Sequence, residues 1–145
     1  MKSKLKITFN APVILGFVAI CFLATLVGDW TRGRSNELLF MTYHSSLRDP
    51  LTYLRFVTHV FGHGGWEHFL GNMGYVLLLG PMLEEKYHSK TLMIVIGITA
   101  LATGLINYIF FPQVALCGAS GVVFAFILMA SFTASMFKNG SPIRV

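Results

Sequence analysis

Four long apolar stretches dominate this chain of 145 residues and limit what it can fold into. They cover residues 11–28, 69–83, 91–111 and 119–137. A helix needs about 20 mostly apolar residues to cross the hydrocarbon core of a bilayer. Overall, 54% of the residues are hydrophobic and only 12% are charged, a balance that is rare in soluble domains. We therefore predict an all-α fold, a polytopic bundle of membrane helices that forms one domain over residues 1–145.

The second stretch, 69–83, admits another interpretation. It is short, contains Asn72 and follows polar, glycine-rich sequence, so it can also form a re-entrant or amphipathic segment. The apolar run ends at Glu84, which is followed by two more charged residues.

The lysines and arginines predict how the chain is oriented. Cytoplasmic loops of membrane proteins carry an excess of basic residues. An N-terminus on the cytoplasmic side places seven of them inside, namely Lys2, Lys4, Lys6, Lys86, Lys90, Lys138 and Arg144, and four outside, namely Arg32, Arg34, Arg48 and Arg55. A cleaved secretory signal is the alternative for the first stretch, but the further spans favour an uncleaved helix. This topology with a short N-terminus suits a bacterial plasma membrane.

The basic charges also bear on possible partners. A net charge of +5 can indicate nucleic-acid binding, but here the charges are scattered around helix ends and form no stripe. We therefore expect the lipid bilayer, and not nucleic acid, to be the partner that this composition reflects. The connection over residues 29–65 reads as a structured loop at the membrane interface, where aromatic residues such as Trp30 and Tyr53 anchor well.

Three histidines and an asparagine crowd into one short segment. His59 and His63 lie among glycines, which predicts a loop, whereas His68 and Asn72 are four residues apart and share one face of a helix. A metal site is one interpretation, but the spacing lacks a His-Glu-x-x-His pattern and Glu67 is the only nearby carboxylate. A structural polar network and a set of donors for developing negative charge are the other two.

A serine between glycines opens the last apolar stretch, in the sequence Gly118-Ala119-Ser120-Gly121. Taken alone, this motif more often marks close packing of membrane helices. Acyl transfer by a serine, however, needs preorganised donors for the oxyanion, and His68, Asn72 and the unpaired N–H groups of a helix start can supply them. The two clusters are therefore chemically complementary. The two cysteines, Cys21 and Cys117, have no spacing typical of metal or disulfide sites and read as packing residues.

From about Leu54 to Ser131 the chain resembles the rhomboid family of intramembrane serine proteases. The resemblance implies a rhomboid-like bundle with about four of the usual six transmembrane helices, acting on a transmembrane protein substrate without metal or cofactor. It implies that Ser120 is the nucleophile and that His68 and Asn72 contribute to the oxyanion hole. The resemblance also implies structural roles, in shaping loops and joining helices, for Arg55, His59, His63, Glu84, Gly118 and Gly121.

Two departures from the family pattern stand out. Leu54 occupies a position where the family prefers tryptophan, and no histidine follows Ser120, although the family takes its base from a sixth membrane helix. We therefore expect a domain that is incomplete at its C-terminus, with residues 138–145 starting a cytoplasmic turn, and a chain that is poorly stable and inactive alone. A non-catalytic rhomboid-like protein that binds membrane helices is the alternative, and a histidine-lined metal or proton pathway is a third class.

Overall fold

The computed structural model describes residues 10–138, and within this range it contains helices and no strand. The four long helices are α1 (Pro12–Trp30), α4 (Trp66–Tyr87), α5 (Ser89–Phe110) and α6 (Ser120–Lys138). Two short helices, α2 (Arg34–Leu39) and α3 (Pro50–Thr58), lie in the connection between α1 and α4. The predicted all-α class is confirmed. The predicted turn over 139–145 and the lysines at positions 2, 4 and 6 lie outside the described residues.

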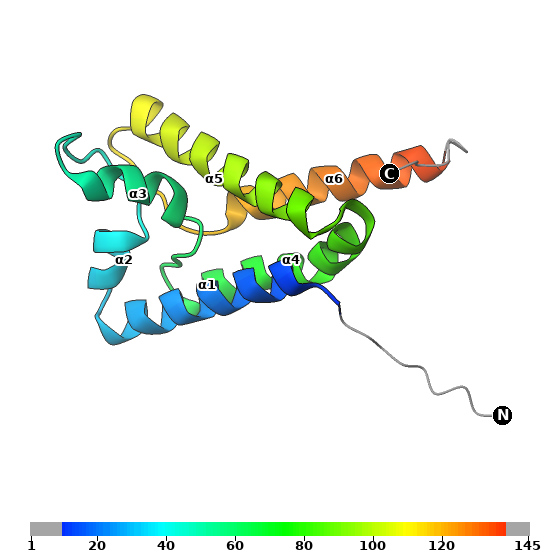
Figure 1. The fold of residues 1–145 in the computed structure, drawn as a ribbon. Helices are drawn as coiled ribbons and strands as arrows, with labels where there is room; N and C mark the ends of the chain where they lie inside the picture. Colours follow the sequence, from blue (N-terminus) through cyan, green and yellow to red (C-terminus); the bar gives the residue numbers. More distant parts are fainter. Residues whose placement is uncertain (1–9, 139–145) are drawn as a thin grey trace.

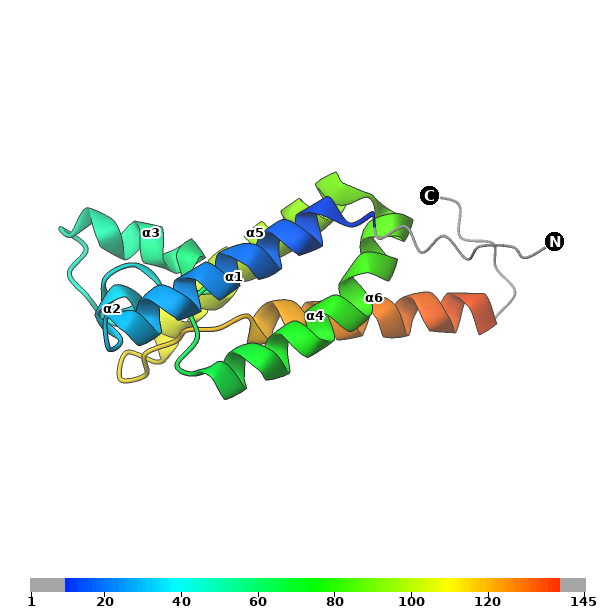
Figure 2. The same cartoon turned by 90° about the horizontal axis from the view of Figure 1, so that it is seen from below.

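Helix α4 contacts the other three long helices, α1, α5 and α6. Figure 1 shows α2 and α3 gathered at the end of the bundle where α1 and α5 finish, and Figure 2 shows the same arrangement from below. The helix is continuous for 22 residues, so the second apolar stretch belongs to one long helix. It continues past Glu84 to Tyr87, because charged residues end an apolar run without ending a helix.

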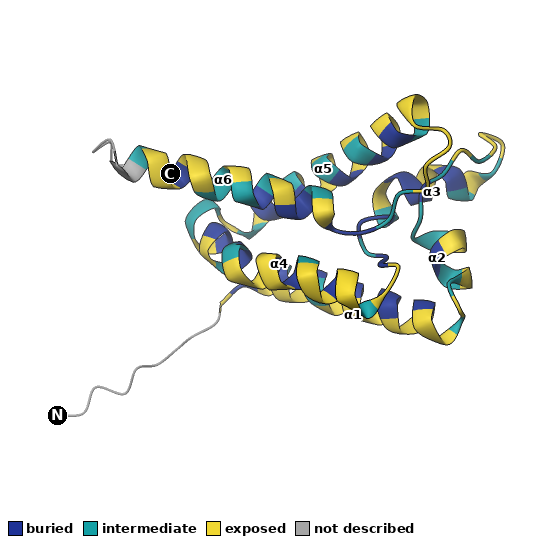
Figure 3. Ribbon diagram, turned by 180° about the vertical axis from the view of Figure 1, so that it is seen from behind, coloured by how far each residue is buried: buried dark blue, intermediate teal, exposed yellow. Residues whose placement is uncertain are grey.

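Two of the described helices, α1 and α5, are long and apolar enough to cross a membrane. The apolar part of α6 covers Ser120–Met136. Helix α4 is continuous, but polar residues such as His68 and Asn72 interrupt its apolar sequence. Many large apolar residues of the long helices are exposed, with Leu78 exposed by 73% and Phe132 by 66%. Figure 3 shows exposed residues in yellow along these helices. Soluble monomers rarely expose apolar surface on this scale, whereas contact with lipid explains it.

Close approach of the helices depends on small residues. A Cβ atom at Gly80 of α4 would lie 2.6 Å from Cδ1 of Ile14, so glycine lets α1 pack directly on α4. Gly104 of α5 similarly touches the backbone of Phe56 in α3. The interior between the long helices is filled by fully buried apolar side chains, including Val76, Leu92, Val122 and Phe126.

A buried carboxylate joins the start of α1 to the end of α4. Glu84 is 3% exposed and accepts hydrogen bonds from the backbone N–H groups of Val13 (2.9 Å) and Ile14 (3.0 Å) and from the Ser89 hydroxyl (2.7 Å). The first N–H groups of a helix have no partner within the helix. Glu84 therefore satisfies two orphan donors of α1 and fixes the turn into α5.

The connection over 29–65 differs from the loop that the sequence predicts, because α2 and α3 form within it. Asp49 caps α3 by accepting the N–H of Leu51 at 3.0 Å, and Pro50 occupies the first helical position, where no N–H is needed. At the other end of the bundle, His88 connects α4 to α5 with φ 74° and ψ 157°, a region populated almost only by glycine.

Candidate active site

The turn before α6 is fastened to the segment that carries His59 and His63. The N–H of Gly118 donates to the carbonyl of His59 at 2.8 Å, and the N–H of Ala119 donates to Nε2 of His63 at 3.3 Å. Gly118 has φ 120°, which an L-amino acid rarely adopts, so glycine is needed to make the turn. Helix α6 then begins at Ser120.

The bonding around His63 assigns its tautomer. Its Nδ1 lies 3.3 Å from the carbonyl oxygen of Phe61, which can only accept, so Nδ1 carries the proton and Nε2 is the free acceptor for Ala119. Burial is the largest influence on this ring and lowers the pKa of His63; the hydrogen bond to the Phe61 carbonyl opposes this shift, and the nearby His68 adds to it. The neutral form that the turn requires is therefore the favoured one.

His59 is buried in the same way. Its Nε2 lies 2.9 Å from the carbonyl oxygen of Ala100 on α5, so Nε2 carries the proton. Burial lowers the pKa of His59 as well. The two histidines thus link the 59–63 segment to α5 on one side and to the turn before α6 on the other.

A second set of contacts holds the loop before Gly118. Thr42 and Leu116 exchange two backbone hydrogen bonds, of 2.9 and 2.8 Å, and form an isolated antiparallel bridge. The hydroxyl of Tyr108 donates to the carbonyl of Ser45 at 2.6 Å, and the amide of Asn107 donates to the carbonyl of Val114 at 2.9 Å. The outer connection and the loop before α6 are therefore one interlocked unit.

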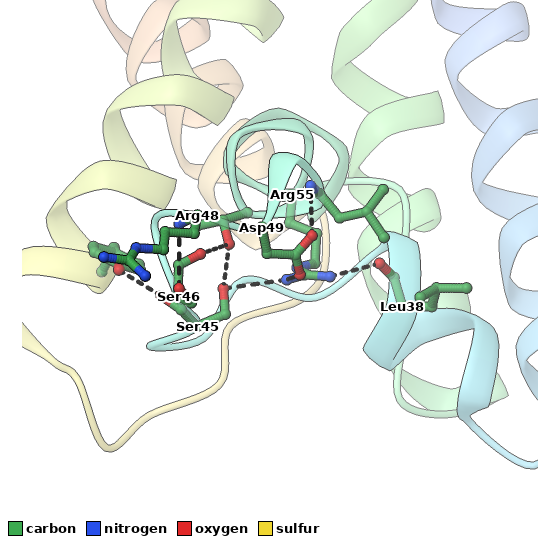
Figure 4. Close-up of polar contacts among 9 residues, drawn as sticks. Leu38, Ser45, Ser46, Arg48, Asp49 and Arg55 are labelled. Atoms are coloured by element: carbon green, nitrogen blue, oxygen red, sulfur yellow. Dashed lines mark hydrogen bonds and ion pairs between the residues drawn. The ribbon is translucent and has the colours of Figure 1, made fainter.

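Arg55 organises that outer connection from the inside, as Figure 4 shows. The arginine is 1% exposed and donates to the Leu38 carbonyl at 2.9 Å, to the Ser45 hydroxyl at 3.1 Å and to Asp49 Oδ2 at 3.2 Å. Its guanidinium also lies 4.8 Å from the centre of the Tyr43 ring. Since arginine stays charged under all ordinary conditions, these acceptors compensate a permanent buried charge.

The three residues predicted for the chemistry meet at one hollow between α4 and α6. His68 and Asn72 lie one turn apart on α4, and Ser120 lies at the start of α6. They line a cavity of about 280 Å³ together with Glu67, Gly71, Tyr75 and Val123. A Cβ atom at Gly118 would lie 3.7 Å from Nδ2 of Asn72, which places this amide beside the turn.

Ser120 also lines a second hollow, of about 240 Å³, on the α5 side of the turn. Its other lining residues include His59, Thr103 and Gly121. A Cβ atom at Gly121 would lie 3.2 Å from Cγ2 of Thr103, so this glycine allows α6 to start close to α5. The serine is therefore accessible from two sides of the turn.

The five histidines differ in their access to Ser120. His44 stacks on Tyr108 in the outer connection, His59 and His63 are held by backbone groups, and His88 lies at the opposite end of the bundle. His59 also lines the smaller hollow beside Ser120, but its Nε2 is bonded to the carbonyl of Ala100. His68 lines the hollow that Ser120 shares with Asn72. Across residues 10–138, no group of three His, Cys, Asp or Glu side chains is placed to hold a metal ion.

Sequence reasoning placed Ser120, His68 and Asn72 together but missed most of what positions them. Two contacts join segments more than 50 residues apart, namely the Thr42–Leu116 bridge and the Ala119–His63 hydrogen bond. No local sequence pattern predicts such contacts. Burial raises the pKa of the Cys117 thiol, which precedes Gly118, and so favours the neutral thiol.

Comparison with known proteins shows that the chain belongs to the rhomboid family. A family model described as the Rhomboid domain matches residues 50–143. The chain is 33% identical over 101 residues to rhomboid-related protein 2 of Mus musculus, a match that covers 64% of this chain and 33% of the relative. It is 30% identical over 73 residues to rhomboid-like protein 11, chloroplastic, of Arabidopsis thaliana, covering 50% of this chain and 26% of the relative.

A third relative is the rhomboid protease GlpG of Haemophilus influenzae, which is 25% identical over 118 residues. That match covers 80% of this chain and 59% of the relative. In all three cases the chain spans less than two thirds of the length of the relative that it matches.

Proposed function

Because the chain belongs to the rhomboid family, we propose that Ser120 is the nucleophile of an intramembrane serine endopeptidase that cleaves peptide bonds in or near membrane-spanning segments. The observation that carries the proposal is the single hollow that Ser120 shares with His68 and Asn72. The chain is an integral membrane protein. We further propose that it resides in a bacterial plasma membrane with its N-terminus in the cytoplasm, so that the hollow opens toward the outer side.

In the proposed reaction the Ser120 hydroxyl attacks the carbonyl carbon of the scissile bond. The developing oxyanion accepts hydrogen bonds from Asn72 Nδ2, from a ring N–H of His68 and from unpaired N–H groups at the start of α6. Each such donor contributes typically about 3 kcal/mol to transition-state stabilisation. His63, which accepts the N–H of Ala119, keeps this turn in place.

The reaction also needs a base that takes the serine proton and returns it to the leaving amine. His68 is assigned to the oxyanion here, and the family's base would come from a later helix, whereas this sequence contains no histidine after Ser120. We expect the isolated chain to retain oxyanion binding while losing most of the rate enhancement, since in serine proteases the oxyanion hole and binding alone supply only about 10³–10⁴ over water.

A second candidate function, equally compatible with membership of the rhomboid family, is that the same hollow binds a membrane helix without cleaving it. Both candidates use the α4–α6 face, but only the first requires a reactive serine.

Labelling by a serine-directed fluorophosphonate tests the first candidate. We expect slow labelling of the chain in bicelles, loss of labelling in Ser120→Ala, and no change in Ser131→Ala, an exposed serine of the same helix. Free imidazole added as a substitute base is expected to accelerate labelling. Labelling that persists in Ser120→Ala contradicts the assignment of the nucleophile. If the chain binds a single-span peptide but Ser120 never reacts, with or without imidazole, the binding function is supported.

A further inference from the structure

The hollow beside Ser120 contains a carboxylate that the proposed chemistry does not use. Glu67 lies in the first turn of α4, and Gly71 and Tyr75 follow it at four-residue intervals along one side of the helix. All three line the cavity of about 280 Å³ with Ser120. The hollow is therefore built from two stripes of α4, one carrying the proposed oxyanion donors and one carrying Glu67.

Among the acidic and basic side chains that line the hollow, negative charge is in excess. Its lining residues include the carboxylate of Glu67 and no lysine or arginine. Within residues 10–138, Glu67 forms no ion pair with a lysine, arginine or histidine side chain. The helix dipole stabilises a carboxylate in the first turn of a helix, but this does not explain why Glu67 lines the same hollow as Ser120.

The space next to Glu67 suits one long side chain. A Cβ atom at Gly71 would meet no heavy atom within 4 Å, so the floor between Glu67 and Tyr75 is open. Tyr75 is 52% exposed and carries an aromatic ring, to whose face ammonium and guanidinium groups are attracted. Asn72, whose side-chain amide includes an acceptor oxygen, lines the same cavity.

We propose that Glu67, Gly71 and Tyr75 form a subsite for a lysine or arginine side chain of the polypeptide that the hollow receives. This inference rests on the proposed function, because it assumes that a membrane polypeptide is presented to Ser120. The cationic head pairs with Glu67 and lies on the Tyr75 ring, while the aliphatic stem crosses the open floor at Gly71. The subsite thus selects substrates with a basic residue next to the segment that Ser120 contacts.

The test compares two single-span peptides that differ at one residue next to the membrane segment, lysine in one and leucine in the other. Binding to the full chain in bicelles is followed by fluorescence anisotropy of the labelled peptide. We expect the lysine peptide to bind about two- to five-fold more tightly, the range for a partly exposed ion pair. Glu67→Gln is expected to remove this preference and leave the affinity for the leucine peptide unchanged.

Three further variants sharpen the comparison. Glu85→Gln changes a carboxylate of the same helix that faces a different hollow, so the preference is expected to remain. Gly71→Leu fills the open floor and is expected to weaken binding of the lysine peptide. Glu67→Lys is expected to favour a matched glutamate peptide. High salt is expected to shrink every charge preference, since exposed ion pairs are screened.

Equal affinity of the wild-type chain for the lysine and leucine peptides would overturn the subsite, and so would an equal effect of Glu67→Gln on both peptides. If Ser120 is labelled but the charge preference is missing, the subsite alone is wrong. If neither peptide binds and Ser120 is not labelled, the proposed function and the subsite are both wrong.

Discussion

Protonation of His63 is expected to loosen the turn that presents Ser120. In the neutral ring Nε2 accepts the N–H of Ala119, a residue that is fully buried. A proton on Nε2 converts the acceptor into a donor that faces another donor, so the Ala119 N–H loses its partner. An unsatisfied buried group of this kind costs about 1–3 kcal/mol.

The direction of the pH effect follows from the lowered pKa of His63. The unfolded chain binds a proton near the ordinary value of 6.5, whereas the folded chain resists protonation until a lower pH. The stabilising contribution is therefore complete above pH 6.5 and is lost as the pH falls from there toward the folded-state pKa. His59 is shifted in the same direction, so the free energy of unfolding is expected to fall by up to about 2.7 kcal/mol per pH unit where both histidines contribute.

Denaturant unfolding of the chain in micelles between pH 5 and 8, followed by tryptophan fluorescence, measures this slope. His63→Gln keeps an acceptor for Ala119 but cannot titrate, so we expect about half of the acid sensitivity to disappear. His44→Gln is the matched control, because His44 is exposed in the outer connection. A full slope in His63→Gln, or stability that rises as the pH falls below 6.5, would refute the reasoning.

Three further substitutions probe the features that surround the site, each by thermal unfolding. Arg55→Lys keeps the charge but loses the forked contacts, and we expect a loss of about 2 kcal/mol against almost none for exposed Arg48→Lys; equal effects would contradict the buried network. Gly118→Ala forces a methyl group onto a residue at φ 120° and is expected to cost about 1–3 kcal/mol and slow Ser120 labelling, whereas Gly64→Ala, in open space, is expected to do neither. His88→Gly removes backbone strain and is expected to stabilise by about 1 kcal/mol; a lower melting temperature would indicate that the imidazole itself is needed.

The long helices could be predicted from the sequence because each has a pattern of apolar or polar residues within its own segment. Apolar runs mark α1, α5 and α6, and the four-residue spacing of His68 and Asn72 places them on one face of α4. The glycines around His63 also predict the loop between α3 and α4 correctly. These features depend only on neighbours in the chain.

The outer connection could not be predicted in the same way. Helices α2 and α3 are six and nine residues long, too short to be stable through helix propensity alone. They are held by tertiary contacts such as the hydrogen bond from Arg55 of α3 to the Leu38 carbonyl of α2. The turn at Gly118 and the acceptor role of His63 likewise depend on hydrogen bonds between the 59–63 segment and residues 118 and 119, which are distant in the sequence.

The hydrogen bonds of Glu84 have a consequence for how α1 can vary. They reach the backbone N–H groups of residues 13 and 14 and so are indifferent to the side chains at those positions. Pro12, directly before them, has no N–H, so sliding α1 by one residue toward its C-terminus would present a position that cannot donate. Pro12 and Glu84 together therefore fix the axial position of α1 relative to α4. The lipid-facing side chains of α1 can be substituted without affecting these hydrogen bonds, whereas an axial shift of the helix cannot be tolerated in the same way.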